Sequence, residues 1–352
     1  MEQIQKNIED SFRKQVQSDV KLKNAYLLAD SDKLGIHIGV AEGTSGDKKA
    51  NIKQPNYMAS VGKLFTATLI GILYEKGKLA YGDKLDKYLD EELLDGLHVF
   101  KGIDHSGEIT VEQLLNHTSG LYDCFWPLFE KLRDDHSLSL SPREALEWGK
   151  QHLKPLAPPG KKFSYSDTNY YLLGFIIEKI MGLPFHEALK EYIFRPLQMN
   201  NSYMLHYSEP LEDTEYPLAN FYGHGINFTE VKGLAGIDYA GGGVVAPMHD
   251  LLKFMKALVE HKIVQKETLE QMKDDTETFS LGIGYGYGIW KFRAVPLLTP
   301  KKFTCWGVAG VIGAFMFFHP GSEAYIIGNF NDLSYKSKAL RFMLLKVIKQ
   351  LG

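Results

Sequence analysis

Hydrophobic residues follow a helical period in some parts of the chain and a strand-like period in others. Residues 3–17 carry apolar positions at helical spacing, which predicts an amphipathic helix. Residues 25–29 and 35–41 have strand composition on either side of a polar turn at 30–33, which predicts a pair of strands. Residues 64–73 are apolar almost all round, so we expect a helix that is buried in the core.

The middle of the chain changes character. From residue 85 to residue 203 the pattern is mainly helical, with loops rich in Gly, Pro, Asp and Ser. The predicted helical segments of this region are 111–115, 142–152, 170–181 and 185–194. Residues 209–237 show no regular pattern, so we expect an irregular connection there.

Strand-like segments return towards the C-terminus. Strands are predicted at 284–291, 302–306, 313–318 and 324–329, and helices at 248–261 and 336–350. Because both ends of the chain supply strands and a terminal helix, they predict one sheet covered by helices, with the helical middle as an insertion. We therefore expect an α/β (α+β) protein in which residues 1–80 and 240–352 form the sheet lobe and residues 81–239 form a mainly helical lobe.

The composition is that of an ordinary globular protein, with 352 residues, 44% hydrophobic and 24% charged. A formal net charge of -3, with both signs interspersed, provides no basic surface for nucleic acid or an anionic membrane. The polar N-terminus lacks a signal-peptide core and no run reaches transmembrane length, so we expect a cytoplasmic location. Cys124 and Cys305 form neither a metal-binding spacing nor a disulfide framework, and we expect buried free thiols.

The first candidate for chemistry is the pair Ser60 and Lys63, which precedes the apolar run 64–73. Residues at positions i and i+3 share one face of a helix, so a hydroxyl and an amine are placed together. Burial would lower the pKa of the lysine towards that of a useful base. A serine before an apolar helix is more often only an N-cap, so these two residues alone leave both interpretations open.

Four ordered motifs decide between these interpretations. They are residues 58–66 (MASVGKLFT), 109–121 (ITVEQLLNHTSGL), 159–174 (PGKKFSYSDTNYYLLG) and 240–243 (AGGG) leading into Asp250 and Leu251. Together they resemble the serine β-lactamase and penicillin-binding-protein superfamily, specifically its class C β-lactamase-like branch with family VIII-type carboxylesterases and D-stereospecific peptidases. The resemblance implies a β-lactamase/transpeptidase-like fold, an antiparallel sheet flanked by helices with an inserted helical lobe, and an active site between the lobes.

The resemblance implies that Ser60 is the nucleophile and that Lys63 and Tyr165 move its proton. The second motif of the family is Tyr-x-Asn, and here Asp167 replaces the asparagine. A carboxylate accepts hydrogen bonds but does not donate them, so Asp167 is expected to pair with Lys63, raising its pKa, and to provide no donor to a substrate carbonyl. Asn169 is a nearby alternative donor.

The third motif of the family is Lys-Thr-Gly or His-x-Gly, and the resemblance places Val308, Ala309 and Gly310 there. The basic residue that would hold a substrate carboxylate is missing, which favours a neutral ester or amide. With Asp167, these three residues are the expected substrate-binding set. The backbone amides of Ser60 and Val311 are the oxyanion-hole donors that the resemblance implies.

Other conspicuous residues have simpler explanations. The resemblance implies that His117 forms a structural turn rather than acting in catalysis. The alternating glycines of residues 282–288 predict a strand with a close backbone approach. The aromatic-rich loops 122–129 and 221–228 either line the cleft or pack in the core. No metal-binding motif is present.

The function expected from these residues is two-step acyl transfer by a serine hydrolase that needs no cofactor. The expected partner is a small-molecule ester, amide or β-lactam, and a carboxylic ester is favoured. Two alternatives remain: a β-lactamase or D-Ala-type peptidase, and a catalytically weak binding protein that keeps only the fold. No sequence pattern sets an oligomeric state.

Overall fold

The computed structural model describes residues 2–274, 277–295 and 300–351. The α-helices are α1 (Glu2–Gln17), α2 (Gly62–Glu75), α3 (Glu91–Leu94), α4 (Val111–Leu115), α5 (Phe125–Asp134), α6 (Pro142–His152), α7 (Thr168–Met181), α8 (Phe185–Leu189), α9 (Gly233–Asp238), α10 (Met248–Val259), α11 (Lys266–Asp274), α12 (Lys338–Phe342) and α13 (Lys349–Leu351). The π-helical segments Lys190–Phe194 and Met343–Ile348 continue α8 and α12. None of the described helices is both long and apolar enough to cross a membrane.

The strands are β1 (Asn24–Ser31), β2 (Ile36–Ser45), β3 (Lys48–Lys49), β4 (Asn56–Tyr57), β5 (Val99–Phe100), β6 (Ile103–Asp104), β7 (Tyr203–Met204), β8 (Tyr222–Gly223), β9 (Ile226–Asn227), β10 (Val244–Ala246), β11 (Glu277–Ser280), β12 (Ile283–Tyr285), β13 (Trp290–Phe292), β14 (Cys305–Ala309), β15 (Phe315–His319) and β16 (Ala324–Asn329). The main sheet has the order β11-β12-β13-β14-β15-β16-β1-β2-β3. All of its neighbouring strands are antiparallel.

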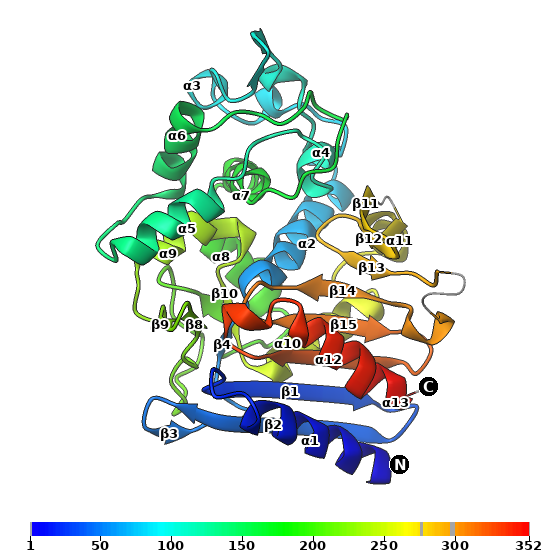
Figure 1. The fold of residues 1–352 in the computed structure, drawn as a ribbon. Coiled ribbons are helices and arrows are strands. Elements are labelled where there is room, and N and C mark those ends of the chain that lie inside the picture. Colours follow the sequence, from blue (N-terminus) through cyan, green and yellow to red (C-terminus); the bar gives the residue numbers. More distant parts are fainter. Residues whose placement is uncertain (1, 275–276, 296–299, 352) are drawn as a thin grey trace.

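The two ends of the chain meet in the centre of this sheet. β1 pairs with β16, so that Leu28 lies opposite Ile327, and Figure 1 shows the blue N-terminal strands beside the orange C-terminal ones. This arrangement confirms the predicted antiparallel sheet built from both chain ends. The strands β1 and β16 are buried almost throughout because helices cover both faces of the sheet.

One face of the sheet is covered by α1 and by the C-terminal helices, whose Phe12 and Phe342 pack with Leu27 and Phe317 of the strands. On the other face α10 contacts β1, β15 and β16. α2 packs against α10 through the stacked rings of Phe65 and Phe254, 3.9 Å apart. This packing fixes α2, the helix that follows Ser60.

The elements between residues 91 and 238 are mainly helical, as expected. In Figure 1 the helices α3, α5 and α6 lie away from the main sheet, and α7 packs on both α2 and α4. The helices α4 and α6 begin with capping boxes at Thr110 and Ser141, which fix their starts where the sequence pattern places them. The boundaries proposed for the two lobes stay a prediction.

Several predicted elements were wrong in detail. Residues 284–291 are not one strand but parts of β12 and β13, joined by a turn in which the Gly286 N–H donates to the Ile289 carbonyl at 2.8 Å. Residues 122–129 are not a loop, since they contain the start of α5, and residues 209–237 include most of α9. The turn predicted at 30–33 lies at 32–35, ending on Gly35 with a positive φ of 59°. α11 was not predicted.

Candidate active site

The candidate nucleophile lies immediately before the buried helix α2. Ser60 belongs to a short 3-10 turn, Ala59–Val61, and its Oγ is 3.4 Å from Lys63 Nζ. Ser60 is 7% exposed and Lys63 is 0% exposed. Gly241 lies opposite Lys63, where there is no space for a larger residue. A Cβ on Gly241 would lie 3.3 Å from Lys63 Nζ and 2.7 Å from Asp167 Oδ1.

Two acceptors hold the Lys63 ammonium. Its Nζ donates to the Gly241 carbonyl at 2.7 Å and forms a buried ion pair with Asp167. Burial acts to lower the pKa of Lys63, but Asp167, followed by Tyr165 and Asp238, outweighs it and raises the pKa above its usual value. The sequence led us to expect two opposing effects on the pKa of Lys63, a decrease from burial and an increase from pairing with Asp167, and the effect of Asp167 is the larger.

Tyr165 stands beside this pair at the start of the segment that leads into α7. Lys63 Nζ lies 5.1 Å from the centre of the Tyr165 ring. Burial raises the pKa of the Tyr165 phenol to about 12, although Lys63 and hydrogen bonding with Ser60 act to lower it. The phenol is therefore protonated at neutral pH and is placed to donate a proton.

The His117 ring packs against the Tyr165 ring. The two rings are 4.3 Å apart, and His117 Nδ1 accepts the backbone N–H of Ser166 at 3.2 Å. Burial, then the charge of Lys63, hold the pKa of His117 well below its usual value, so the ring is neutral. Asn169 Nδ2 lies 3.0 Å from the same Nδ1 and the amide is 0% exposed, so Asn169 does not face the cavity.

Two further carboxylates that the sequence argument did not consider lie beside Asp167. Asp123 Oδ1 accepts the backbone N–H of Asp167 at 3.1 Å, and Asp238 Oδ2 accepts the Tyr57 hydroxyl at 2.6 Å. Burial, then the charge of Asp167, raise the pKa of Asp123 to about 7 and that of Asp238 to about 6. Their sequence positions offered a weak signal, since Asp123 follows the 109–121 motif and Asp238 precedes the AGGG motif.

The end of β14 forms another side of the site. Ala309 ends the strand, and Gly310 and Val311 follow it; all three line the cavity at Ser60. Val308 is 1% exposed, packs in the core and is not among the cavity residues. Behind Lys63, a Cβ on Gly288 would lie 2.8 Å from the Lys63 carbonyl oxygen, which is the close backbone approach that the alternating glycines indicated.

These elements enclose a cavity of about 240 Å³ above Ser60. Its lining comprises Tyr57, Ala59, Ser60, Asp123, Phe125, Trp126, Tyr165, Asp167, Asp238, Phe279, Trp290, Ala309, Gly310, Val311, Lys336 and Leu340. Phe125 and Trp126 come from the segment predicted as an aromatic loop, whereas Phe221 and Phe228 face a separate, smaller cavity. The structure therefore brings together Ser60, Tyr165 and Asp167 with the end of β14.

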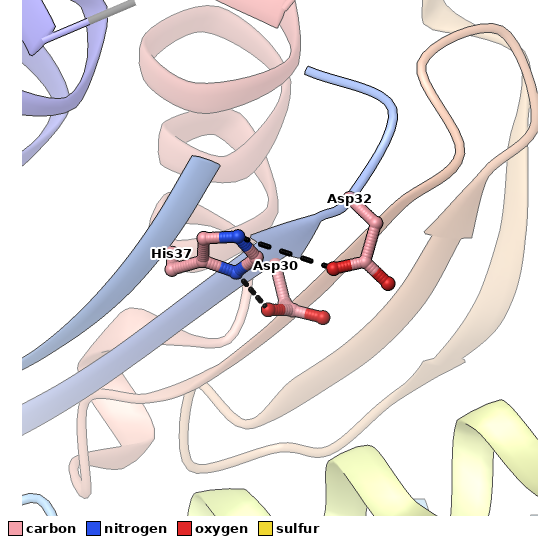
Figure 2. A group of neighbouring side chains, drawn as sticks. All are labelled: Asp30, Asp32 and His37. Atoms are coloured by element: carbon pink, nitrogen blue, oxygen red, sulfur yellow. Dashed lines mark hydrogen bonds and ion pairs between the residues drawn. The ribbon is translucent and has the colours of Figure 1, made fainter. Parts of the chain in front are cut away.

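A second cluster of ionisable groups, none of which lines this cavity, lies at the end of β1. His37 Nδ1 is 2.7 Å from Asp30 Oδ1 and His37 Nε2 is 3.9 Å from Asp32 Oδ1, as Figure 2 shows. Three such ligand atoms within 4.8 Å of one another resemble a metal site. Lys256 Nζ, however, lies 2.7 Å from Asp30 Oδ2, so a lysine ammonium already supplies the positive charge here.

The fold and the arrangement of Ser60, Lys63 and Tyr165 agree with the family to which the sequence is similar. A sequence profile of the Beta-lactamase family matches residues 26–347. The chain therefore belongs to the Beta-lactamase family. This family has the fold of the serine hydrolases that are related to penicillin-binding proteins.

Individual relatives are distant. Penicillin-binding protein 4* of Bacillus subtilis (strain 168) is 28% identical over 247 residues, which cover 65% of this chain and 51% of that protein. The chain spans about half the length of the curated relatives it matches first. Among solved structures, a D-amino acid amidase from Ochrobactrum anthropi SV3 has a TM-score of 0.79 at 21% identity, covering 99% of this chain and 98% of that one. EstCE1, a hydrolase with promiscuous acyltransferase activity, has a TM-score of 0.79 at 19% identity, covering 99% and 98% of the two chains.

Proposed function

We propose that this protein is a serine hydrolase that forms an acyl-enzyme on Ser60 and acts on carboxylic esters or related amides whose acyl group carries no negative charge. The observation that carries the proposal is the contact of Ser60 Oγ with Lys63 Nζ at 3.4 Å, at the floor of a cavity that Tyr165 also lines. The names of the solved relatives, an amidase and a hydrolase with acyltransferase activity, support acyl transfer as the reaction class.

The proton of Ser60 needs an acceptor. Lys63 is already protonated and Tyr165 holds its proton, whereas the Asp167 carboxylate that contacts Lys63 is the available base. We assign the first step to a relay: the Ser60 proton moves to Lys63 Nζ as a Lys63 proton moves to Asp167. The Ser60 oxygen then forms a bond to the substrate carbonyl carbon.

Collapse of the tetrahedral intermediate requires a proton on the leaving group. Tyr165 is suited to this donation because its phenol is protonated and interacts with Ser60. The relay then runs in reverse: Asp167 returns its proton to Lys63 as Lys63 gives one to Tyr165, so all three groups regain their resting states. Water releases the acyl group by the same steps. The backbone amides of Ser60 and Val311, both at the cavity, are the proposed donors to the oxyanion.

The charges of the cavity lining support the choice of substrate. Among the residues described, the cavity lining carries three aspartates and one lysine, so a substrate carboxylate would meet an unfavourable field. A β-lactam or a peptide ending in a free carboxylate is correspondingly disfavoured. Turnover of such substrates in preference to esters would contradict this part of the proposal.

The test combines a substitution with a label. Ser60→Ala should abolish hydrolysis of p-nitrophenyl acetate, with a loss of about 100-fold or more in kcat/KM. Intact-protein mass spectrometry with a fluorophosphonate probe should find one adduct in the native protein, on Ser60, and none in Ser60→Ala. Unchanged hydrolysis in Ser60→Ala would assign the reaction to another group. A folded native protein that neither the probe nor any ester modifies would support the binding-protein alternative.

A further inference from the structure

Asp123 is a carboxylate of the active-site cavity to which no part of the proposed mechanism assigns a role. Its Oδ1 accepts two backbone N–H groups at 3.1 Å, those of Phe125 and Asp167. For Oδ2, the structure shows no hydrogen-bond partner among residues 2–274, 277–295 and 300–351. Because Asp123 lines the cavity, this oxygen is the one available to a ligand.

The three cavity aspartates differ in what compensates their charge. Asp167 has the ammonium of Lys63, and Asp238 has the Tyr57 hydroxyl together with the Gly243 N–H at 2.7 Å. Asp123 has only backbone dipoles, and within the described part of the chain no lysine, arginine or histidine forms an ion pair with it. A half-buried carboxylate without a counter-ion is a poor structural element but a suitable receptor for a cation.

The walls beside Asp123 also suit a cation. Phe125, Trp126, Phe279 and Trp290 line the same cavity, and aromatic faces attract ammonium groups. One ammonium of the chain itself demonstrates this property, because Lys336 Nζ lies 5.4 Å from the centre of the Trp126 ring. The cavity of about 240 Å³ is small for a ligand site, which restricts the acyl group to about the size of one amino acid.

The position of Asp123 relative to the nucleophile sets where the cation must lie. Asp123 is hydrogen-bonded to the backbone of Asp167, Asp167 is paired with Lys63, and Lys63 contacts Ser60. Asp123 and Ser60 also line the same cavity of about 240 Å³, so an ammonium bound to Asp123 and a carbonyl at Ser60 fit within one small substrate. α-Amino acid esters and amides have this arrangement.

We infer that Asp123 is a substrate-binding residue that receives a positively charged amino group, and that the substrates are esters or amides of single α-amino acids with a free amine. This inference rests on the proposed function and narrows it to a substrate class. The carboxylate would gain the counter-ion that the fold does not provide. Burial and the neighbouring Asp167 raise the pKa of Asp123 to about 7, which is the cost that a bound ammonium would offset.

The test compares three esters that differ at the amine: phenylalanine methyl ester in D and L forms, its N-acetyl derivative, and methyl 3-phenylpropionate. At about pH 6.5 the free α-amine is mostly protonated. The native protein should prefer one free-amine ester over the uncharged esters by about tenfold or more in kcat/KM. Asp123→Asn keeps an acceptor for both backbone N–H groups but removes the charge, so it should reduce this ratio to near one.

Asp213→Asn is the matched control, since Asp213 is exposed and outside the cavity, and it should leave the ratio unchanged. A ratio that is near one in the native protein, or that Asp123→Asn does not alter, would overturn the inference. In either case Asp123 would serve only to join α5 to the Asp167 segment. A preference for the monomethyl ester of succinic acid would instead assign the cavity to carboxylates through Lys336.

A binding experiment separates this inference from the proposed hydrolase activity. Quenching of tryptophan fluorescence, from Trp126 and Trp290 at the cavity, should show that phenethylamine binds about tenfold more tightly than 2-phenylethanol to Ser60→Ala protein. The added Asp123→Asn change should remove the difference. Selective amine binding without ester turnover would retain the amine site and reject the hydrolase, whereas turnover without amine selectivity would do the reverse.

Discussion

Two lysine–aspartate pairs in this protein have similar chemistry and very different surroundings. The Lys63 and Asp167 side chains are 0% and 6% exposed, whereas those of Lys256 and Asp30 are 32% and 13% exposed. In both pairs the counter-charge outweighs the effect of burial: the pKa of Lys63 lies above its usual value and that of Asp30 lies below. Ion pairing alone therefore does not distinguish a site from a surface contact.

The difference lies in what else each pair touches. Lys63 also contacts Ser60 and faces the Tyr165 ring, so a proton that moves within the pair reaches a nucleophile. Asp30 contacts His37, whose side chain is largely exposed. His37 in turn lies near Asp32, whose side chain is more exposed than that of His37, as Figure 2 shows. Water screens this second pair, and His37 is not among the described residues that line the cavity at Ser60. The comparison predicts that matched substitutions in the two pairs have very unequal effects.

The largest effect is expected for Lys63→Met, which keeps the apolar stem and removes the amine. Asp167 then remains buried without its cation, so the free energy of unfolding should fall by about 3 kcal/mol or more. The proton relay also loses its middle member, and kcat/KM for p-nitrophenyl acetate should fall by about 1000-fold. Urea unfolding and ester kinetics measure the two effects. Full activity in a folded Lys63→Met protein would remove the buried pair from the mechanism.

A smaller loss is expected for Tyr165→Phe, in which the ring still packs on His117 but the phenol is gone. If Tyr165 protonates the leaving group, kcat/KM should fall by about 100-fold for an alkyl ester. The loss should be smaller for p-nitrophenyl acetate, because p-nitrophenolate leaves without a proton. Equal losses for the two esters would indicate that Tyr165 acts earlier, on Ser60.

The catalytic candidates could be predicted from the sequence more easily than the carboxylates that surround them. Ser60, Lys63 and Tyr165 lie in contiguous motifs, and their grouping follows from a family pattern together with the i, i+3 spacing of a helix. Asp123 and Asp238 were missed because their meaning depends on contacts 44 residues away in one case and 181 in the other. The direction in which the pKa of Lys63 shifts likewise depends on whether burial or the charge of Asp167 has the larger effect. Only the three-dimensional positions of these groups decide that balance.

Fold prediction shows the same division. Strand and helix periodicity found most elements of the sheet and the ends of α4, α6 and β16 as the structure has them. The single strand predicted at 284–291 failed because its apolar and glycine residues serve a turn that approaches Lys63. The start of α5 was missed although its buried residues Phe125, Leu128, Phe129 and Leu132 have helical spacing, because the aromatic content of the segment suggested a loop.

Asp167→Asn tests whether the charge of Asp167 is needed in the buried pair. The substitution restores the residue that the family pattern has and removes the counter-charge of Lys63. In the proposed relay the variant has no carboxylate to accept the proton, so Lys63 must act as a free amine. Without Asp167 the pKa of Lys63 falls, yet the amine is free only above that pKa. We expect kcat/KM at neutral pH to fall about tenfold and to recover as the pH rises.

A pH–rate profile measures this effect, with Asp30→Asn as the matched control that changes the same charge in the exposed pair. That control should leave the profile unchanged. If Asp167→Asn is instead faster than the native protein at neutral pH, Asp167 merely keeps Lys63 charged and is not the proton acceptor.

The smallest effect is expected for Lys256→Met, the counterpart of Lys63→Met in the exposed pair. Asp30 then loses its cation but keeps His37 Nδ1 at 2.7 Å and its contact with water, so its charge remains solvated. The free energy of unfolding should fall by at most about 1 kcal/mol, and by less at 0.5 M salt than at low salt, because screening already weakens the pair. Urea unfolding at two salt concentrations measures this, with ester hydrolysis unchanged. A loss as large and as independent of salt as that of Lys63→Met would show that exposure does not separate the two pairs, and that their difference lies only in the contact of Lys63 with Ser60.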